Sequence, residues 1–241
     1  MPVTVELPLR EVRESEPYPM PRGTWPANLA PVEQVLDEGF EFGQATIFVG
    51  ENGSGKSTLV EAIALAYGLS PEGGSTWAMH STRATESVLH KHLTLSRGRG
   101  AARQGYFLRA ETMHGFFTYL EEHQGGGQPD PVFHELSHGE SFMELISSRF
   151  RMRGLYILDE PESALSFHGC LALVSVLNEL LAAGGSQVII STHSPILAAL
   201  PGAQLYELGD WGLRPRYWDE LELTRNWRSF LEGPERFLRH L

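Results

Sequence analysis

One loop constrains the fold of this 241-residue chain more than any other feature. Residues 50–57 read GENGSGKS, which fits the pattern G-x-x-x-x-G-K-[ST] in full. The apolar run ATIFVG leads into the loop, and the segment after it has the apolar spacing of a helix. A strand, a glycine loop and a helix in this order predict an α/β fold with a mostly parallel central sheet flanked by helices.

The chemistry of this loop predicts a phosphate site. Glycines let the backbone turn successive N–H groups toward phosphate oxygens, and a helix that begins near Gly55 directs its positive dipole end at them. Lys56 is expected to reach the outer phosphates, and the Ser57 hydroxyl to ligate Mg²⁺. We predict that nucleotide is bound by Gly50, Asn52, Gly53, Ser54, Gly55, Lys56, Ser57 and Thr58.

A second apolar strand, GLYILDE, ends in two acids. Many strands end this way, so the feature gains weight only beside the phosphate loop. There, Asp159 is expected to hold Mg²⁺, directly or through water, and Glu160 to polarise the attacking water as general base. The pair therefore predicts ATP and Mg²⁺ as the ligands of the site.

Short apolar segments alternating with helical ones extend the sheet along the chain. The further strands expected are YFLRAE, SQVIIST, AQLYELG and LRPRYW. SPILAALPG is expected to form a short helix capped by Ser194 with Pro195 in its first turn. From Asp219 onward the chain has the pattern of an amphipathic helix.

We expect a single domain over residues 1–241. Residues 1–44 form an N-terminal β and proline-rich strap, in which EPYPMPRGTWP cannot be regular structure because prolines fix the backbone and remove donors. Residues 69–140 are expected to form an insertion and small helical lobe, irregular over 69–103. An aromatic residue for stacking on a base is expected in the strap, where Tyr18 and Trp25 are candidates.

The formal net charge of −11 argues against a protein whose main task is to cover nucleic-acid phosphates. A local basic stretch, residues 83–109, leaves nucleic-acid binding open, as an alternative to a solvated loop or to arginines that face nucleotide phosphate. Its candidate residues are Arg97, Arg99, Arg103 and Arg109. No apolar stretch reaches the length of a membrane span and the first residues lack the pattern of a signal peptide, so we expect a cytoplasmic protein with no membrane span.

Four marks occur in order: the loop at 50–57, LSHGE at 136–140, ILDEPESALS at 157–166, and VIISTHSP with His193. In these marks the chain resembles the ATP-binding cassette (ABC) class of P-loop ATPases over residues 45–207. The sequences of the motifs are similar to those of small stand-alone bacterial ATPases, which are relatives of structural-maintenance-of-chromosomes (SMC) and overcoming-lysogenization nuclease heads.

The resemblance implies a head-to-tail homodimer that closes on two ATP. Its signature residues would contact the γ-phosphate of ATP held by the other subunit, and His193 would hydrogen-bond that phosphate or the attacking water. Ser163 and Ser166 would belong to the D-loop at the dimer interface, and Glu111 would take the place of the Mg²⁺-sensing Q-loop residue. The signature residues are Ser137, His138, Gly139 and Glu140.

The chain departs from the family pattern at several positions, and two of these departures, Glu111 and Ser166, argue against fast, tightly coupled hydrolysis while leaving binding intact. Glu111 stands where glutamine is usual, and Ser166 where aspartate is usual. The signature has His138 in place of a glycine and Glu140 in place of glutamine. Whether His138 merely fits the loop or donates to the γ-phosphate stays open.

Other functions fit the sequence less well. A P-loop kinase would have no use for the LSHGE and THSP motifs. A transporter ATPase, or a nucleic-acid-linked repair or defence complex with an unknown effector protein, remains an alternative. A serine hydrolase built on Ser141 is excluded because Met143 occupies the last glycine of the G-x-S-x-G pattern.

Overall fold

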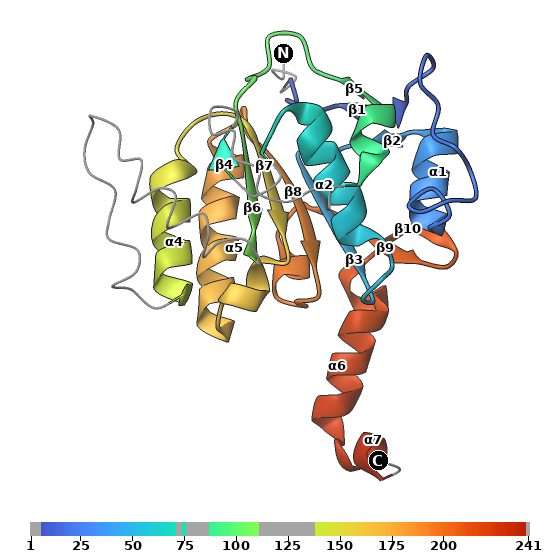
Figure 1. Cartoon of the computed structure of the whole chain (residues 1–241). Helices are drawn as coiled ribbons and strands as arrows, with labels where there is room; N and C mark the ends of the chain where they lie inside the picture. The colour runs from blue at the N-terminus through green and yellow to red at the C-terminus, as the bar shows by residue number, and fades with distance from the viewer. Residues whose placement is uncertain (1–5, 71–73, 76–86, 111–137, 240–241) are drawn as a thin grey trace.

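Two sheets organise the computed structural model, which describes residues 6–70, 74–75, 87–110 and 138–239 (Figure 1). The larger sheet has seven strands in the order β10-β9-β3-β8-β7-β6-β4. Its five central strands run parallel, and β4 and β10 pair antiparallel at the two edges. The strands are β3 (Ala45–Gly50), β4 (Gly74–Ser75), β6 (Gly105–Arg109), β7 (Leu155–Asp159), β8 (Gln187–Thr192), β9 (Gln204–Gly209) and β10 (Gly212–Arg216).

Helices cover both faces of this sheet, as predicted for a parallel sheet with apolar strands. Every residue of β7 and β8 is buried. Alternate side chains of β3 point to opposite faces: Ile47 packs in the core that holds α4 and α5, and Phe48 in the core that holds α2. The helices are α2 (Lys56–Tyr67), α4 (His138–Arg149) and α5 (Phe167–Ala182). The predicted fold class is therefore confirmed.

A small antiparallel sheet places β1 (Glu11–Glu14) between β2 (Phe40–Glu41) and β5 (Leu93–Ser96). The 3₁₀ turn η1 (Val88–His92) leads directly into β5. The expectation that residues 69–103 are irregular is therefore wrong for residues 88–96, where β1 supplies the partner that the local sequence does not reveal. The predicted lobe between residues 111 and 137 lies outside the described residues.

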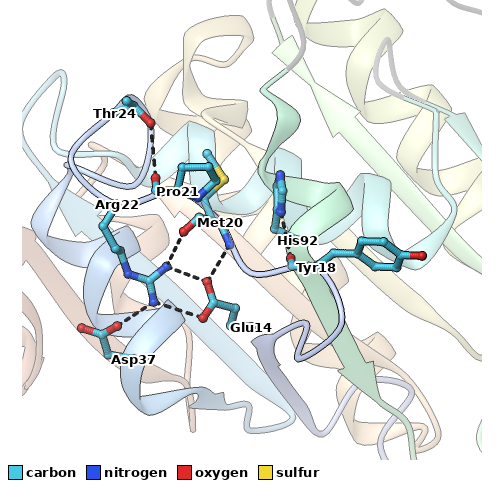
Figure 2. A network of polar contacts seen from close by, with 8 residues as sticks. All are labelled: Glu14, Tyr18, Met20, Pro21, Arg22, Thr24, Asp37 and His92. Atoms are coloured by element: carbon cyan, nitrogen blue, oxygen red, sulfur yellow. Dashed lines mark hydrogen bonds and ion pairs between the residues drawn. The ribbon is translucent and has the colours of Figure 1, made fainter.

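The proline-rich part of the strap has no helix or strand, as predicted, yet polar contacts fix it (Figure 2). The Arg22 guanidinium bonds both oxygens of Glu14, at 2.5 and 3.2 Å, and reaches Asp37 at 2.7 Å. The hydrogen bond from Arg22 lowers the pKa of Glu14. Asp37 belongs to α1 (Ala30–Glu38), a helix that the sequence analysis did not expect.

The C-terminal part differs from expectation in one element. Residues 194–202 form only a 3₁₀ turn, η5 (Leu197–Ala199), because Pro201 cannot continue a helix so close to β9. The Ser194 hydroxyl accepts the N–H of Ile196 at 3.3 Å. The amphipathic helix predicted beyond Asp219 is present as α6 (Glu222–Glu232), followed by α7 (Glu235–Leu238). Among the described residues, the helices are too short or too polar to cross a bilayer.

Candidate functional site

The loop between β3 and α2 needs glycine at three of its positions. Gly53 and Gly55 have φ angles of 82° and 95°, in the left-handed region that side chains disfavour. A Cβ atom at Gly50 would lie 2.4 Å from the carbonyl oxygen of Leu208 on β9. Backbone geometry therefore requires these three glycines of the motif. They allow the loop to lie at the carboxyl end of the sheet.

Lys56 is the first residue of α2 and is only 3% exposed. Its Nζ donates to the carbonyl oxygen of Glu51 within the loop, at 3.0 Å. Burial lowers the pKa of Lys56, and the nearby carboxylates, Glu160 first, oppose that shift. The loop thus holds a partly desolvated ammonium group among acids, a setting in which an added phosphate would gain a strong partner.

Asp159 ends β7 between two polar neighbours from adjacent strands. The register aligns it with Arg109 on β6 and with Ser191 on β8. The Ser191 hydroxyl donates to its carboxylate, and Arg109 Nε lies 3.3 Å from Oδ2. Burial raises the pKa of Asp159, while Ser191, Arg109 and Ser57 counteract it. Carboxylate and hydroxyl oxygens are the ligands that Mg²⁺ prefers, so Asp159 and Ser57 suit that ion.

Glu160 adopts a left-handed backbone, with φ 48° and ψ 50°, the sole non-glycine residue with positive φ in the described part of the chain. Such conformations are costly and gather at functional sites. Its Oε1 accepts the Ser57 hydroxyl at 3.5 Å and lies 3.3 Å from His193 Nε2. Ser57 of α2 and His193 after β8 therefore meet at the carboxylate of Glu160, which follows β7.

Glu162 is a site residue that the sequence analysis missed. Its carboxylate accepts the backbone N–H of His193. Burial raises the pKa of Glu162, and the hydrogen bond from His193 opposes the shift. Glu160 and Glu162 thus hold the ring and the backbone of the same histidine. The second acid two residues after Glu160 was the signal available in the sequence.

The D-loop serines have partners within their own chain. Ser163 Oγ donates to the carbonyl oxygen of Glu160 at 2.7 Å. Ser166 caps α5 by accepting the Gly169 N–H at 3.2 Å. These contacts explain a local need for both hydroxyls and leave their role at a dimer interface a prediction.

The signature residues are described only in part. His138 begins α4, and Glu140 is exposed in its first turn. A Cβ atom at Gly139 would lie 3.3 Å from the carbonyl oxygen of Ala164, in the 3₁₀ turn η4 (Pro161–Ala164). Ser137 and Glu111 lie outside the described residues.

A cavity of about 300 Å³ opens beside the loop. Residues 50–54 form one wall, and His193 and the turn between β9 and β10 form others. Trp211 in that turn, 43% exposed, was not anticipated from the sequence. The first residues of α6, Glu222 and Leu223, complete the lining.

The two candidates for base stacking differ in their surroundings. Tyr18 and Trp25 are 68% and 57% exposed. Leu29, four residues after Trp25, stands 3.3 Å from a Cβ atom built on Gly55, so the segment carrying Trp25 approaches the phosphate loop. The Tyr18 carbonyl instead contacts His92 Nδ1 at 2.9 Å (Figure 2). The stacking role of either residue stays a prediction.

Two arginines of the basic stretch contact other parts of the chain. Arg97 stacks over the Tyr67 ring, 4.1 Å from its centroid, and donates to the Tyr67 carbonyl. Arg109 pairs with Glu61 of α2 at 2.7 Å. Arg97, Arg99 and Arg103 are all exposed, so the nucleic-acid alternative stays a prediction.

Comparison with known families matches residues 34–163 to the ABC transporter family. Among curated proteins, the cytochrome c biogenesis ATP-binding export protein CcmA of Sodalis glossinidius (strain morsitans) is 28% identical over 178 residues. That alignment covers 68% of this chain and 82% of CcmA.

A solved ABC transporter structure shares the fold at low sequence identity. An inward-facing metal-chelate type ABC transporter aligns with a TM-score of 0.51 and 15% identity, over 93% of this chain and 88% of that chain. The SMC head domain from Thermotoga maritima aligns with a TM-score of 0.43 and 16% identity, over 74% of this chain and 93% of that one.

Proposed function

The chain belongs to the ABC transporter family and is an ATP-binding ATPase, and we propose that it works as a switch that dimerises head to tail around two ATP molecules and opens after hydrolysis. The observation that carries the chemical part is the convergence of Ser57, Glu160 and His193 beside the buried Lys56. The dimer, the roles of individual residues and the Mg²⁺ site are the proposal.

In the proposed reaction, Glu160 accepts a proton from a water molecule as the water oxygen bonds to the γ-phosphorus of ATP. The bond from that phosphorus to the bridging oxygen breaks, which releases ADP and phosphate. His193, whose Nε2 lies 3.3 Å from Glu160, would donate its N–H toward the phosphoryl oxygens. A Mg²⁺ ion held by Ser57 and Asp159 would neutralise charge on the phosphates.

Lys56 contributes by binding charge rather than by transferring protons. Its ammonium group, now directed at the Glu51 carbonyl, would exchange that neutral partner for phosphate oxygens. A charge-assisted hydrogen bond is stronger than the neutral one it replaces. The exchange favours ATP over an empty loop and keeps the phosphates beside Glu160.

The dimer is supported by the position of the signature helix. α4 lies beyond α5, away from the loop between β3 and α2 (Figure 1). Gly139 packs beside Ala164 of its own chain and does not line the cavity next to the phosphate loop. A signature that touches the γ-phosphate therefore requires a second copy of the chain. A two-fold dimer would place each signature over the other copy's loop.

Glu160→Gln tests the proposal. Without the base, ATP should persist and hold the dimer closed, so the variant should elute as a dimer in gel filtration with ATP and Mg²⁺, and as a monomer with ADP. Glu160→Gln combined with Lys56→Ala is the matched control, which should bind no ATP and stay monomeric. A Glu160→Gln protein that binds ATP but remains monomeric would rule out the dimer switch.

A transporter ATPase is the second assignment, because CcmA is named as an export protein. In that case the effector partner would be a membrane subunit, which the chain would bind from the cytoplasmic side. Recovery of the chain with the membrane fraction, lost after removal of that subunit, would support it. Recovery of the protein entirely in the soluble fraction of its source cells would count against it and leave the stand-alone switch, in which partner and pathway are separate questions.

A further inference from the structure

The C-terminal arm, residues 222–239, leaves the body at the edge where the phosphate loop lies. Figure 1 shows α6 projecting beyond that edge, with α7 at its far end. Glu222 and Leu223 still line the cavity beside the loop, and Thr224 is the buried residue of α6. The eleven residues of α6 make a rod about 16 Å long at 1.5 Å per residue. Anything that covers the phosphate loop therefore meets the arm as well.

The arm exposes an apolar surface. Trp227 and Leu231, one helical turn apart, are 48% and 73% exposed, and Phe237 and Leu238 on α7 are 43% and 55% exposed. The ring of Phe230 packs on Phe237 with centroids 5.7 Å apart, which holds α7 against α6. Apolar side chains gathered on a projecting element mark an interaction surface.

A second apolar surface lies on the body. A groove of about 410 Å³ is walled by Leu171 and Val174 of α5, by Ile196 after β8, and by Trp218. Trp218 belongs to the 3₁₀ turn η6 (Trp218–Glu220), and its indole N–H donates to the Pro195 carbonyl at 2.8 Å. Among the described residues, the groove lining includes none from α6 or α7. The groove thus adjoins the root of the arm but is not filled by it.

We propose that the arm of one copy docks in this groove on a second copy when the ATP-bound dimer closes; this inference rests on the proposed function. The dimer covers the edge from which the arm projects, so the arm is carried toward the other copy. Because groove and arm adjoin on each chain, a two-fold axis between them lets both arms dock reciprocally.

Charge supports the same occupant. The arm holds four arginines and three glutamates, a formal charge of +1, whereas the whole chain carries −11. A second copy therefore offers the arm a body of net negative charge, which favours their approach. The arm is in this sense complementary to its own chain.

Site-specific cross-linking tests the contact. Two differently tagged chains would share the Glu160→Gln and Cys170→Ala changes, which remove the base and the native thiol. One carries Leu231→Cys on the arm and the other Leu171→Cys in the groove. With ATP and Mg²⁺ a short bismaleimide should join the two tags, and with ADP it should not. The matched control replaces Leu171→Cys with Val88→Cys on η1, because Val88 and Leu171 are 47% and 46% exposed.

Affinity supplies a second readout. Trp227→Ser together with Leu231→Ser removes two exposed apolar side chains, so folding should be kept and ATP binding unchanged. Loss of their burial should raise the dissociation constant of the ATP-dependent dimer roughly tenfold or more. Sedimentation velocity over a concentration series, with Glu160→Gln present in both proteins, measures this constant.

The outcomes separate the two levels of the proposal. Cross-linking no stronger than in the Val88→Cys control, or an unchanged dimer affinity in the double serine variant, overturns the arm contact while the dimer switch stands. Cross-linking that is equal without ATP overturns its dependence on closure. If the Glu160→Gln protein with an intact arm binds ATP and stays monomeric, the dimer switch fails and the arm contact fails with it.

Discussion

Replacing Lys56 with methionine should separate the cost of burying a charge from its use in binding. The ammonium group is 3% exposed, and burial lowers its pKa despite the surrounding carboxylates. A lowered lysine pKa means that the folded protein disfavours the charged form relative to the unfolded chain. Methionine keeps much of the volume without the charge. Lys56→Met should therefore stabilise the nucleotide-free protein while weakening its affinity for ATP.

The magnitudes follow from general constants. Removing the desolvated charge, less the hydrogen bond to Glu51, should raise the free energy of unfolding by about 1 kcal/mol, or ~3 °C in melting temperature for a chain of this size. At ATP 100-fold above its Kd, the wild type gains about 2.7 kcal/mol, or ~8 °C. Loss of roughly 3 kcal/mol of charge-assisted bonding weakens binding by about 100-fold, so the variant should gain only ~1 °C.

The assay is thermal unfolding of both proteins, with and without MgATP. Lys91→Met is the matched control, since Lys91 is exposed on η1 and should change neither value. The pH dependence gives a further check. The penalty on charged Lys56 is present below its lowered folded pKa and disappears as pH rises toward the unfolded value near 10.4. The advantage of Lys56→Met should therefore shrink in alkali. A nucleotide-free Lys56→Met protein several degrees less stable than wild type would refute the reasoning.

Three further predictions concern stability and can be measured by urea unfolding. Gly50→Ala should cost about 3 kcal/mol because its Cβ would meet a carbonyl oxygen at 2.4 Å, whereas Gly53→Ala, with open space around it, should cost only the ~1 kcal/mol of a strained φ. Arg109→Met should cost about 3 kcal/mol by leaving the buried Glu61 and Asp159 without its guanidinium, and adding Glu61→Gln should recover only the part due to Glu61; no recovery would deny that pair. Ser166→Ala should cost about 1 kcal/mol if the hydroxyl caps α5, and an unchanged stability would contradict the cap.

The parts of the site that depend on local backbone chemistry were predictable from the sequence. The glycines at 50–57 and the acids after β7 occupy the ends of strands, where a parallel sheet brings loops together whatever the details of its register. Glu162 was within reach of the same reasoning. Its carboxylate holds the His193 amide, and its place two residues after Glu160 was visible. The prediction stopped at the motif because nothing local reveals that this side chain turns back into the protein.

Elements that depend on distant partners were missed. The segment LTLS has the alternation of a strand, but it follows histidines and precedes SRGRG, so its pairing with β1 was hidden. α1 was different, because Val32, Val35 and Leu36 have helical spacing and Gly39 follows the last turn. That signal was obscured by the prolines of the strap rather than absent. Arg22 then joins the strap to α1 through Asp37, a contact that no local pattern announces.

Arg109 shows why register decides what a residue is for. In the sequence it is one of several arginines in a basic stretch, and a nucleic-acid contact was a reasonable hypothesis. In the sheet it stands opposite Asp159, which stands opposite Ser191. A shift of one residue between β6 and β7 would turn the guanidinium to the other face of the sheet and leave Asp159 without that cation. The fold thus gives the arginines of this stretch different surroundings: Arg109 pairs with the acid at the site, Arg97 lies exposed against the Tyr67 ring, and Arg99 and Arg103 are exposed. Charge along a sequence therefore predicts the character of a surface only after the register has removed the residues that the interior uses.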